Sequence, residues 1–251
     1  MEILNNSTLN FKLETIAFNI ESCHISQAAG AHRIELCDNP GEGGTTPSYG
    51  FIKAARKALN IDLFPIIRPR GGDFLYSDEE FEIMKADVQL CKELGCDGVV
   101  IGMLNEDATI DKKRSSILVN IAYPMSVTFH RAFDRVTAPD QALEDVIEIG
   151  CERILTSGFH PSAIDGAENI KKLISLAGER IIIMPGSGVR SENIISLAES
   201  TGVVEFHSSA RKHISSQMKI INPYMNETLK TISADGEEIE AMIEKLKSIQ
   251  L

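Results

Sequence analysis

The sequence predicts an α/β protein that forms a single (β/α)8 barrel, a closed ring of eight parallel strands, with a helical extension at the C-terminus. Three observations support this prediction: an internal repeat, a regular alternation of strand and helix patterns, and a length of 251 residues. A (β/α)8 barrel typically takes about 250 residues, so the chain is long enough for one complete barrel core.

The repeat is a pattern in which a helix end is followed by Gly, one or two small residues and a short apolar run. It occurs as AAGAHRIELC from Ala28, ELGCDGVVIG from Glu93, EIGCERILTSG from Glu148 and STGVVEFHSS from Ser200. Gly ends helices readily because it adopts the left-handed conformation without a Cβ clash. The apolar run that follows it is typical of a buried strand.

A second set of apolar runs falls between the repeats and brings the number of predicted strands to eight. These runs are Thr15–Asn19, Leu63–Arg68, Met125–His130 and Ile181–Pro185. Helical patterns separate nearly all of the strands, which favours a closed parallel barrel. A doubly wound open sheet is the alternative, and it is less favoured because no dinucleotide-binding glycine fingerprint follows the first strand.

Two of the predicted helices have recognisable start signals. Ser77–Glu80 has the form of a capping box, with a hydroxyl at the cap and a carboxylate three residues later. Pro139 lies in the expected first turn of another helix, where its missing N–H costs little. The buried face of the first helix is marked by apolar residues three and four positions apart, namely Phe81, Met84, Val88 and Cys91.

We expect residues 1–251 to form a single domain, with the barrel over about 13–210 and a loop and final helix over 211–251. The stretch from Arg211 to Thr231 has no clear periodicity and predicts a long loop. The final helix is predicted from about Asp235. Its docking face consists of Ile239, Met242, Ile243, Leu246 and Ile249.

Composition limits the possible partners and the location. The net charge is −11, so the chain lacks the basic footprint that nucleic acids and anionic membranes require. No apolar run is long enough to span a bilayer, and the N-terminus does not resemble a secretion signal. The five cysteines include no Cys-x-x-Cys pair, which indicates free thiols and a cytoplasmic location.

Polar residues gather at the C-terminal ends of the strands, where barrels of this type carry their functional sites. Side chains alternate along a strand, so Glu35 and Cys37 share a face, as do Glu205 and His207. Buried charges need partners, so this layer is either a ligand site or a self-satisfied ion network, for example Glu35 with Arg68. The residues concerned are Glu35, Cys37, Arg68, Arg70, Asp73, His130, Arg131, Glu205 and His207.

A glycine-rich loop, Gly186–Ser187–Gly188, follows the seventh strand and leads towards a helix start near Ser191. The N–H groups of such a loop can bind phosphate or another anion, and barrels often bind phosphate after strands seven and eight. The same Gly-x-Gly pattern also serves ordinary tight turns. The loop is therefore a candidate ligand-binding element.

Several segments resemble the CutC family. They are RIELC, EGGTTPS, IIRPRGGDFLYSDEEFEIMKAD, VTFHRAFD, RILTSG, IIIMPGSGV and EFHSSAR, and they extend from about Leu13 to Arg211. The resemblance implies a TIM-like barrel, a cytoplasmic and self-associating protein (a homo-oligomer), and a link to copper handling.

In CutC-type proteins the proposed copper thiols are a cysteine in the first strand and the cysteine of RIELC. The second is Cys37 here, but Ile16 replaces the first and Phe18 replaces a nearby aspartate. A two-thiolate Cu(I) site of that kind therefore cannot form in this chain. Ser187 also replaces the middle residue of a triple glycine.

Two functions are compatible with these residues. The first is copper homeostasis, with copper ion bound by Cys37, because Cu(I) selects thiolates. The alternative is a barrel enzyme acting on a small anionic or phosphorylated metabolite. In that case the guanidinium groups of Arg68, Arg70 and Arg131 would hold the anion. His130 or Glu205 would act as general acid or base, while His207 and Asp73 would orient the substrate. A scaffold without chemistry fits poorly with charges buried at the barrel end.

Overall fold

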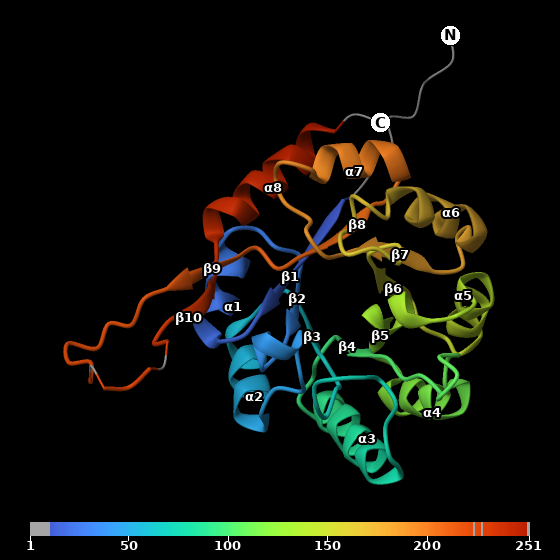
Figure 1. Ribbon diagram of the computed structural model, residues 1–251, viewed down its shortest axis with the longest axis horizontal. Coiled ribbons are helices and arrows are strands. Elements are labelled where there is room, and N and C mark those ends of the chain that lie inside the picture. The colour runs from blue at the N-terminus through green and yellow to red at the C-terminus, as the bar shows by residue number, and fades with distance from the viewer. Residues whose placement is uncertain (1–10, 223, 227, 250–251) are drawn as a thin grey trace.

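The computed structural model describes residues 11–222, 224–226 and 228–249. It confirms the predicted barrel: strands occupy the centre and helices surround them (Figure 1). The barrel strands are β1 (Lys12–Ala17), β2 (Arg33–Leu36), β3 (Asp62–Pro65), β4 (Gly98–Ile101), β5 (Ser126–Phe129), β6 (Arg153–Thr156), β7 (Ile182–Pro185) and β8 (Glu205–Ser208).

The strands form two parallel four-stranded ladders, in the orders β3-β2-β1-β8 and β4-β5-β6-β7. A single bridge between Ile66 and Val100 joins β3 to β4. Between β7 and β8 no ladder is present in the described residues, but the Ser208 hydroxyl donates to the Val189 carbonyl over 2.7 Å. The barrel is therefore closed through two seams, one at each junction of the ladders.

Eight helices surround the strands. They are α1 (Ile20–Ala28), α2 (Tyr49–Ala58), α3 (Asp78–Glu93), α4 (Lys112–Ala122), α5 (Pro139–Glu148), α6 (Ala167–Ala177), α7 (Ile194–Thr201) and α8 (Gly236–Ser248). The predicted C-terminal extension is in fact the eighth barrel helix, since α8 packs between α7 and α1. Two short 3-10 helices, η1 (Pro40–Glu42) and η2 (Arg131–Arg135), follow β2 and β5.

Local sequence signals explain where the helices begin. The Ser77 hydroxyl accepts from the Glu80 N–H, and the Glu80 carboxylate accepts from the Ser77 N–H, which confirms the capping box of α3. Pro139 lies in the first turn of α5, as predicted. The main core lies between the helices and the outer faces of the strands. A smaller apolar cluster within the barrel contains Cys37, Phe64, Ile66 and Val100.

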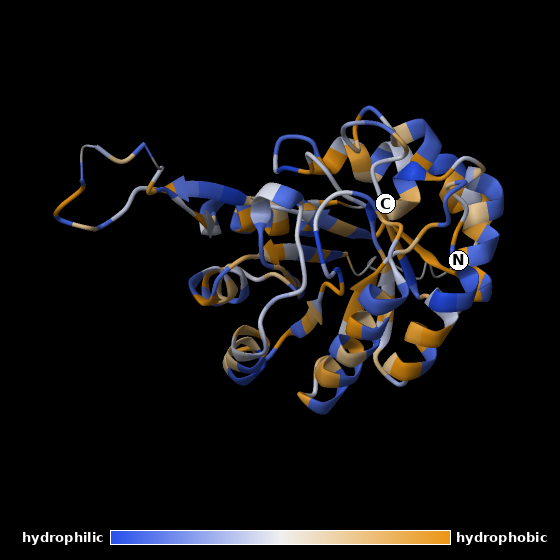
Figure 2. Cartoon of the chain, turned by 60° about the horizontal axis from the view of Figure 1, so that its bottom comes forward, coloured by the Kyte–Doolittle hydropathy of each residue, from blue (hydrophilic) through white to orange (hydrophobic). Residues whose placement is uncertain are grey.

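The segment after β8 differs from the predicted loop. Arg211–Ile214 (β9) pairs with Thr231–Ala234 (β10) as an antiparallel hairpin. The prediction missed it because RKHI lacks the apolar alternation that marks a strand. We call residues 211–234 the arm, and it projects away from the barrel (Figures 1 and 2).

The arm exposes a group of large apolar side chains. They are Met218, Ile220, Ile221, Tyr224, Met225 and Leu229. Figure 2 shows apolar stretches on the loop of the arm, remote from the barrel core. A gathering of exposed apolar side chains on a projecting segment is typical of an interaction surface.

The capping box of α3 gives a stability prediction. Ser77→Ala removes the hydroxyl that accepts from the Glu80 N–H at 3.1 Å. The free energy of unfolding should fall by about 1 kcal/mol, the usual cost of losing an N-cap. Urea denaturation measures this change. Ser77→Thr, which keeps a cap hydroxyl, is the control and should stay much closer to wild type; an equal loss in both variants would contradict the capping role.

Candidate functional site

A cavity of about 850 Å³ opens at the C-terminal ends of the strands. Most of the residues singled out in the sequence contribute to its lining, namely Glu35, Arg68, Asp73, His130, Arg131, Ser187, Gly188 and His207. Four others do not line it: Cys37, Arg70, Gly186 and Glu205. We call this cavity the mouth.

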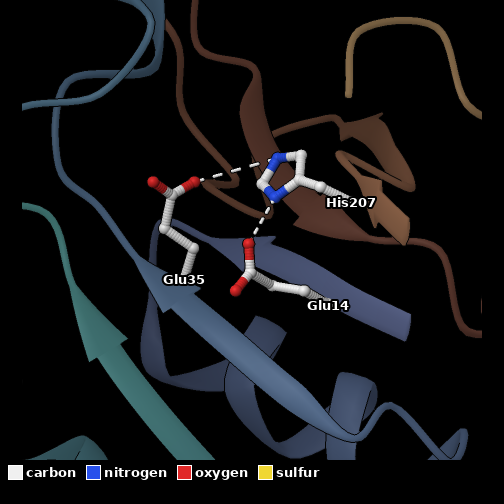
Figure 3. A group of neighbouring side chains, drawn as sticks. All are labelled: Glu14, Glu35 and His207. Carbon is white, nitrogen blue, oxygen red and sulfur yellow. Dashed lines mark hydrogen bonds and ion pairs between the residues drawn. The ribbon is translucent and has the colours of Figure 1, made fainter. Parts of the chain in front are cut away.

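Three buried side chains converge beside the mouth: Glu35 of β2 and His207 of β8, which line it, and Glu14 of β1, which does not (Figure 3). His207 Nδ1 lies 2.7 Å from Glu14 Oε1, and its Nε2 lies 3.8 Å from Glu35 Oε2. One possible ligand atom from each residue lies within 4.8 Å of the other two. We call these residues the triad.

The neighbours of the two carboxyl groups give them opposite properties. Burial alone would raise the pKa of Glu14, but the charge of Arg33 and the hydrogen bond with His207 outweigh it and lower the pKa to about 2. Burial raises the pKa of Glu35 to about 7, against a smaller opposing effect of His207. Burial also opposes the charged form of His207, but its bond to Glu14 raises the pKa above the usual value.

A buried ion network lies beneath the triad, inside the barrel. Arg33 binds Glu14 at 2.5 Å and Glu205 at 2.6 Å, and Arg153 binds Glu205 at 2.8 Å. Both guanidinium groups lie over the ring of Phe64, at 5.0 and 5.5 Å from its centroid. Glu205, a predicted acid or base, is therefore held by two arginines below the mouth.

Cys37 is fully buried beside the triad. Burial and then the charge of Glu35 raise the pKa of its thiol well above the usual value. The backbone of Gly44 covers the sulfur so closely that a Cβ at this position would lie 3.1 Å from Sγ. Cys37 is therefore a protonated, covered thiol. The other cysteines, Cys23, Cys91, Cys96 and Cys151, are also free and buried.

His130 lies on the opposite wall, at the end of β5. Its Nδ1 accepts the Ala132 N–H at 3.1 Å and thereby caps η2. Its Nε2 is buried and has no hydrogen-bond partner among the described residues. Burial, then the charge of Arg68, lower the pKa of the imidazole to about 3, so the ring is neutral.

Arg68 does not pair with Glu35, contrary to the ion pair considered from the sequence. Its terminal nitrogens donate to three backbone carbonyls, those of Glu42, Gly44 and Gly72, over 2.6 to 2.8 Å. Its Nε is buried and has no partner in the described part of the chain. Arg68 thus shapes the loops around the mouth and keeps one N–H donor unused.

The other two arginines that the sequence assigned to an anion, Arg70 and Arg131, form ion pairs with carboxylates of the chain. Arg70 binds Glu80 at 2.6 Å and Asp73 at 3.0 Å, and it lines a neighbouring hollow next to α3. Arg131 lines the mouth and binds Asp134 at 2.7 Å. Of the three arginines assigned to an anion, Arg70 alone lies outside the mouth.

The loop after β7 contributes Ser187 and Gly188 to the lining of the mouth, but it does not run directly into a helix. The helix α7 begins at Ile194, several residues after Gly188. Ser187 has a φ of +80°, a left-handed conformation that favours glycine, which explains the glycine usual at this position in the CutC pattern. Its hydroxyl donates to the Pro161 carbonyl at 2.8 Å.

Sequence reasoning missed three charged residues of the barrel interior: Glu14, Arg33 and Arg153. Glu14 was overlooked because the first strand was predicted to begin at Thr15, whereas β1 begins at Lys12. A usable signal was present, since all three are charged residues within short apolar strands. By strand alternation Glu14 shares a face with Ile16, and Arg33 shares one with Glu35.

The triad offers nitrogen and oxygen ligands for a metal ion. Metal–nitrogen and metal–oxygen bonds of about 2.0–2.2 Å place two ligands of one ion roughly 3–4 Å apart. The 3.8 Å between His207 Nε2 and Glu35 Oε2 fits this range. Glu14 holds the other ring nitrogen, as carboxylates do behind metal-binding histidines.

The neutral state of His130 gives a pH prediction. Because the native state disfavours the protonated ring, unfolding takes up a proton below about pH 6.5, and stability falls as the pH decreases towards 3. His130→Asn should reduce the slope of unfolding free energy against pH by about 1.4 kcal/mol per pH unit between pH 4.5 and 6. Urea denaturation across this range measures the slope; equal slopes in both proteins would contradict a neutral buried His130.

Comparisons with known proteins agree with this architecture. The CutC family model matches residues 11–212. A CutC protein of Chromobacterium violaceum is 54% identical over 207 residues, which cover 82% of this chain and 84% of the relative. The human "Copper homeostasis protein cutC homolog" is 48% identical over 212 residues, covering 84% of this chain and 78% of the relative.

Solved structures show the same fold. The crystal structure named for CutC of Streptococcus agalactiae has a TM-score of 0.76 and 35% identity, and covers 79% of this chain and 98% of that chain. An aldolase with 15% identity and a TM-score of 0.62, covering 82% of this chain and 92% of that chain, shares the fold alone. The family match spans the barrel and the mouth, and the chain belongs to the CutC family.

Proposed function

We propose that this chain is a copper homeostasis protein that binds a copper ion through Glu35 and His207, with Glu14 holding the other ring nitrogen of His207. The observation that carries the proposal is the convergence of three buried side chains, Glu14, Glu35 and His207, beside an open cavity that Glu35 and His207 line. The human and mouse relatives are named copper homeostasis proteins, which supports copper as the ion. The same comparisons do not favour the alternative of an enzyme.

The chemistry of the triad favours Cu(II) over Cu(I). Imidazole and carboxylate ligands suit divalent ions, whereas Cu(I) selects soft thiolates. Among divalent first-row metals, a nitrogen–oxygen site generally binds Cu(II) most tightly. Cys37 is the nearby thiol, but it is protonated and covered, and Ile16 occupies the position of the second family cysteine.

Two further properties belong to the proposal. A cytoplasmic location is supported by the five free, buried thiols, which suit a reducing compartment. None of the helices in the described residues combines the length and apolar composition that a bilayer crossing requires. Self-association with a second copy of the chain is supported by the exposed apolar side chains of the arm.

Copper binding can be tested with Glu35→Gln. Glutamine keeps the shape of the neutral acid, so the fold should be retained, but it removes an anionic ligand. The Cu(II) affinity should fall at least tenfold because one ligand of the ion is lost. Competition with a chromophoric chelator on the full chain measures the affinity.

The matched control is Cys37→Ser, which should bind Cu(II) as tightly as wild type. Reduced, anaerobic protein titrated with Cu(I) completes the comparison. The proposal is contradicted if copper binding survives in Glu35→Gln and disappears in Cys37→Ser.

Self-association can be tested on the arm. Ile220, whose exposed fraction is 84%, would be buried between two copies, so Ile220→Lys should weaken association at least tenfold. Light scattering over a range of concentrations measures the mass. Ser215→Lys, which adds the same charge at an exposed polar position of the arm, is the control; equal masses for all three proteins would rule out an interface at Ile220.

A further inference from the structure

The wall of the mouth opposite the triad carries two buried N–H donors with no acceptor in the described residues: His130 Nε2–H and Arg68 Nε–H. We propose that the mouth binds a small organic oxyanion, a carboxylate or phosphate, whose oxygens accept from both donors. This site goes beyond copper binding and uses none of the three triad residues.

The protonation state of His130 follows from its contacts. The Ala132 N–H donates to Nδ1 at 3.1 Å, so Nδ1 must offer its lone pair and the proton of the neutral ring lies on Nε2. The ring is only 4% exposed and lines the mouth. A buried donor without an acceptor destabilises the free protein, and a bound acceptor would relieve this cost.

Gly102 keeps the His130 ring in this place. A Cβ at position 102 would lie 2.3 Å from both Cε1 and Nδ1 of the imidazole, so the ring packs directly against the glycine backbone. The ring of Phe74 contacts the imidazole as well, with 5.0 Å between centroids. The Nε2–H direction is therefore set by packing on two sides.

Arg68 supplies the charge. Its terminal nitrogens donate to carbonyl groups, the Tyr76 hydroxyl lies beside the guanidinium, and no ion pair of the described residues involves Arg68. The positive charge is 95% buried, since the side chain is 5% exposed, and it is not neutralised by a counter-ion there. A buried, unneutralised guanidinium favours an anionic ligand.

The two donors lie against the same aromatic side chain. Phe74 contacts both: the Arg68 guanidinium carbon lies 5.0 Å from the centroid of its ring, as does the His130 ring. The charge of Arg68 also opposes protonation of His130, which keeps the imidazole a neutral donor. The neutral N–H donor of His130 and the cationic guanidinium of Arg68 together suit an oxyanion ligand.

The rest of the mouth indicates the size and character of the ligand. A volume of about 850 Å³ admits a metabolite of modest size, and the walls include the apolar side chains of Phe74, Leu75 and Leu104. Arg131 and Arg135 also line the cavity. These features fit an organic acid or a phosphorylated compound with a compact carbon body.

The experiment uses full-length protein freed of metal on a chelating resin, with ¹⁵N-labelled histidine. Inorganic phosphate and acetate are the two probes, and sodium chloride at matched ionic strength is the control. We expect His130 to show the Nε2–H tautomer, and its Nε2 signal to shift saturably with one or both oxyanions but not with chloride. Which probe binds more tightly distinguishes a phosphate from a carboxylate ligand.

Two variants separate the donor from the structural role of the ring. In His130→Asn the amide oxygen can take over the role of Nδ1 as the cap of η2, but the Nε2–H donor is lost. Its affinity for the preferred probe, followed by ³¹P or ¹³C line broadening, should fall at least tenfold, as expected when a hydrogen bond to a charged group is lost. His130→Gln places its amide near Nε2 and should keep more of the affinity.

Three results would overturn the inference: a His130 that is protonated on Nδ1, a response to chloride equal to that of the oxyanions, or unchanged affinity in His130→Asn. Glu35→Gln should leave oxyanion affinity within threefold of wild type. Because this variant is the one expected to lose copper, the oxyanion site and the copper site can fail independently.

Discussion

The interaction on which the mouth depends is the pair of bonds from Arg33 to Glu14 and Glu205 inside the barrel. Arg33 is 1% exposed, and its charge could not be buried there without both carboxylates. The positive charge of Arg33 stabilises the ionised form of the Glu14 carboxylate, which binds Nδ1 of His207. The orientation of His207 Nε2 towards Glu35, on which metal binding would rest, therefore originates one layer below.

This arrangement divides the mouth into two walls with different chemistry. The wall formed by β1, β2 and β8 carries two carboxyl groups and the imidazole of His207, which are nitrogen and oxygen ligands, and it suits a metal cation. The wall beyond β3 and β5 carries a guanidinium and a neutral imidazole, and it suits an anion. Burial opposes protonation of both histidines, but Glu14 and Glu35 raise the pKa of His207 whereas Arg68 lowers the pKa of His130 further.

Much of the fold and part of the mouth could be predicted from the sequence. The Gly-punctuated repeat located the strands because it reflects one local unit, a helix end followed by a buried strand. Strand alternation correctly placed Glu35 and His207 in the mouth. The same reasoning failed for Glu14, because a shift of the first strand by a few residues removed it from consideration. It also failed for Arg70, since its partner Glu80 belongs to α3, a contact between segments that no local pattern records. The unused donor of His130 depends on a tautomer, which only the surrounding hydrogen bonds define.

The two ladders of the barrel divide the residues of the mouth between them. Glu14, Glu35 and His207 all belong to the ladder that contains β1, β2 and β8, so hydrogen bonds between adjacent strands fix their relative positions. Arg68 follows β3 in that same ladder, whereas His130 follows β5 in the other ladder, and between β3 and β4 stands the single bridge from Ile66 to Val100. Backbone hydrogen bonds from Ile67 to Val100 and from Asp97 to Leu63 also hold this junction, so the relative position of Arg68 and His130 depends on contacts between the two ladders. The proposed metal site is thus built within one ladder, whereas the proposed anion site is assembled from both.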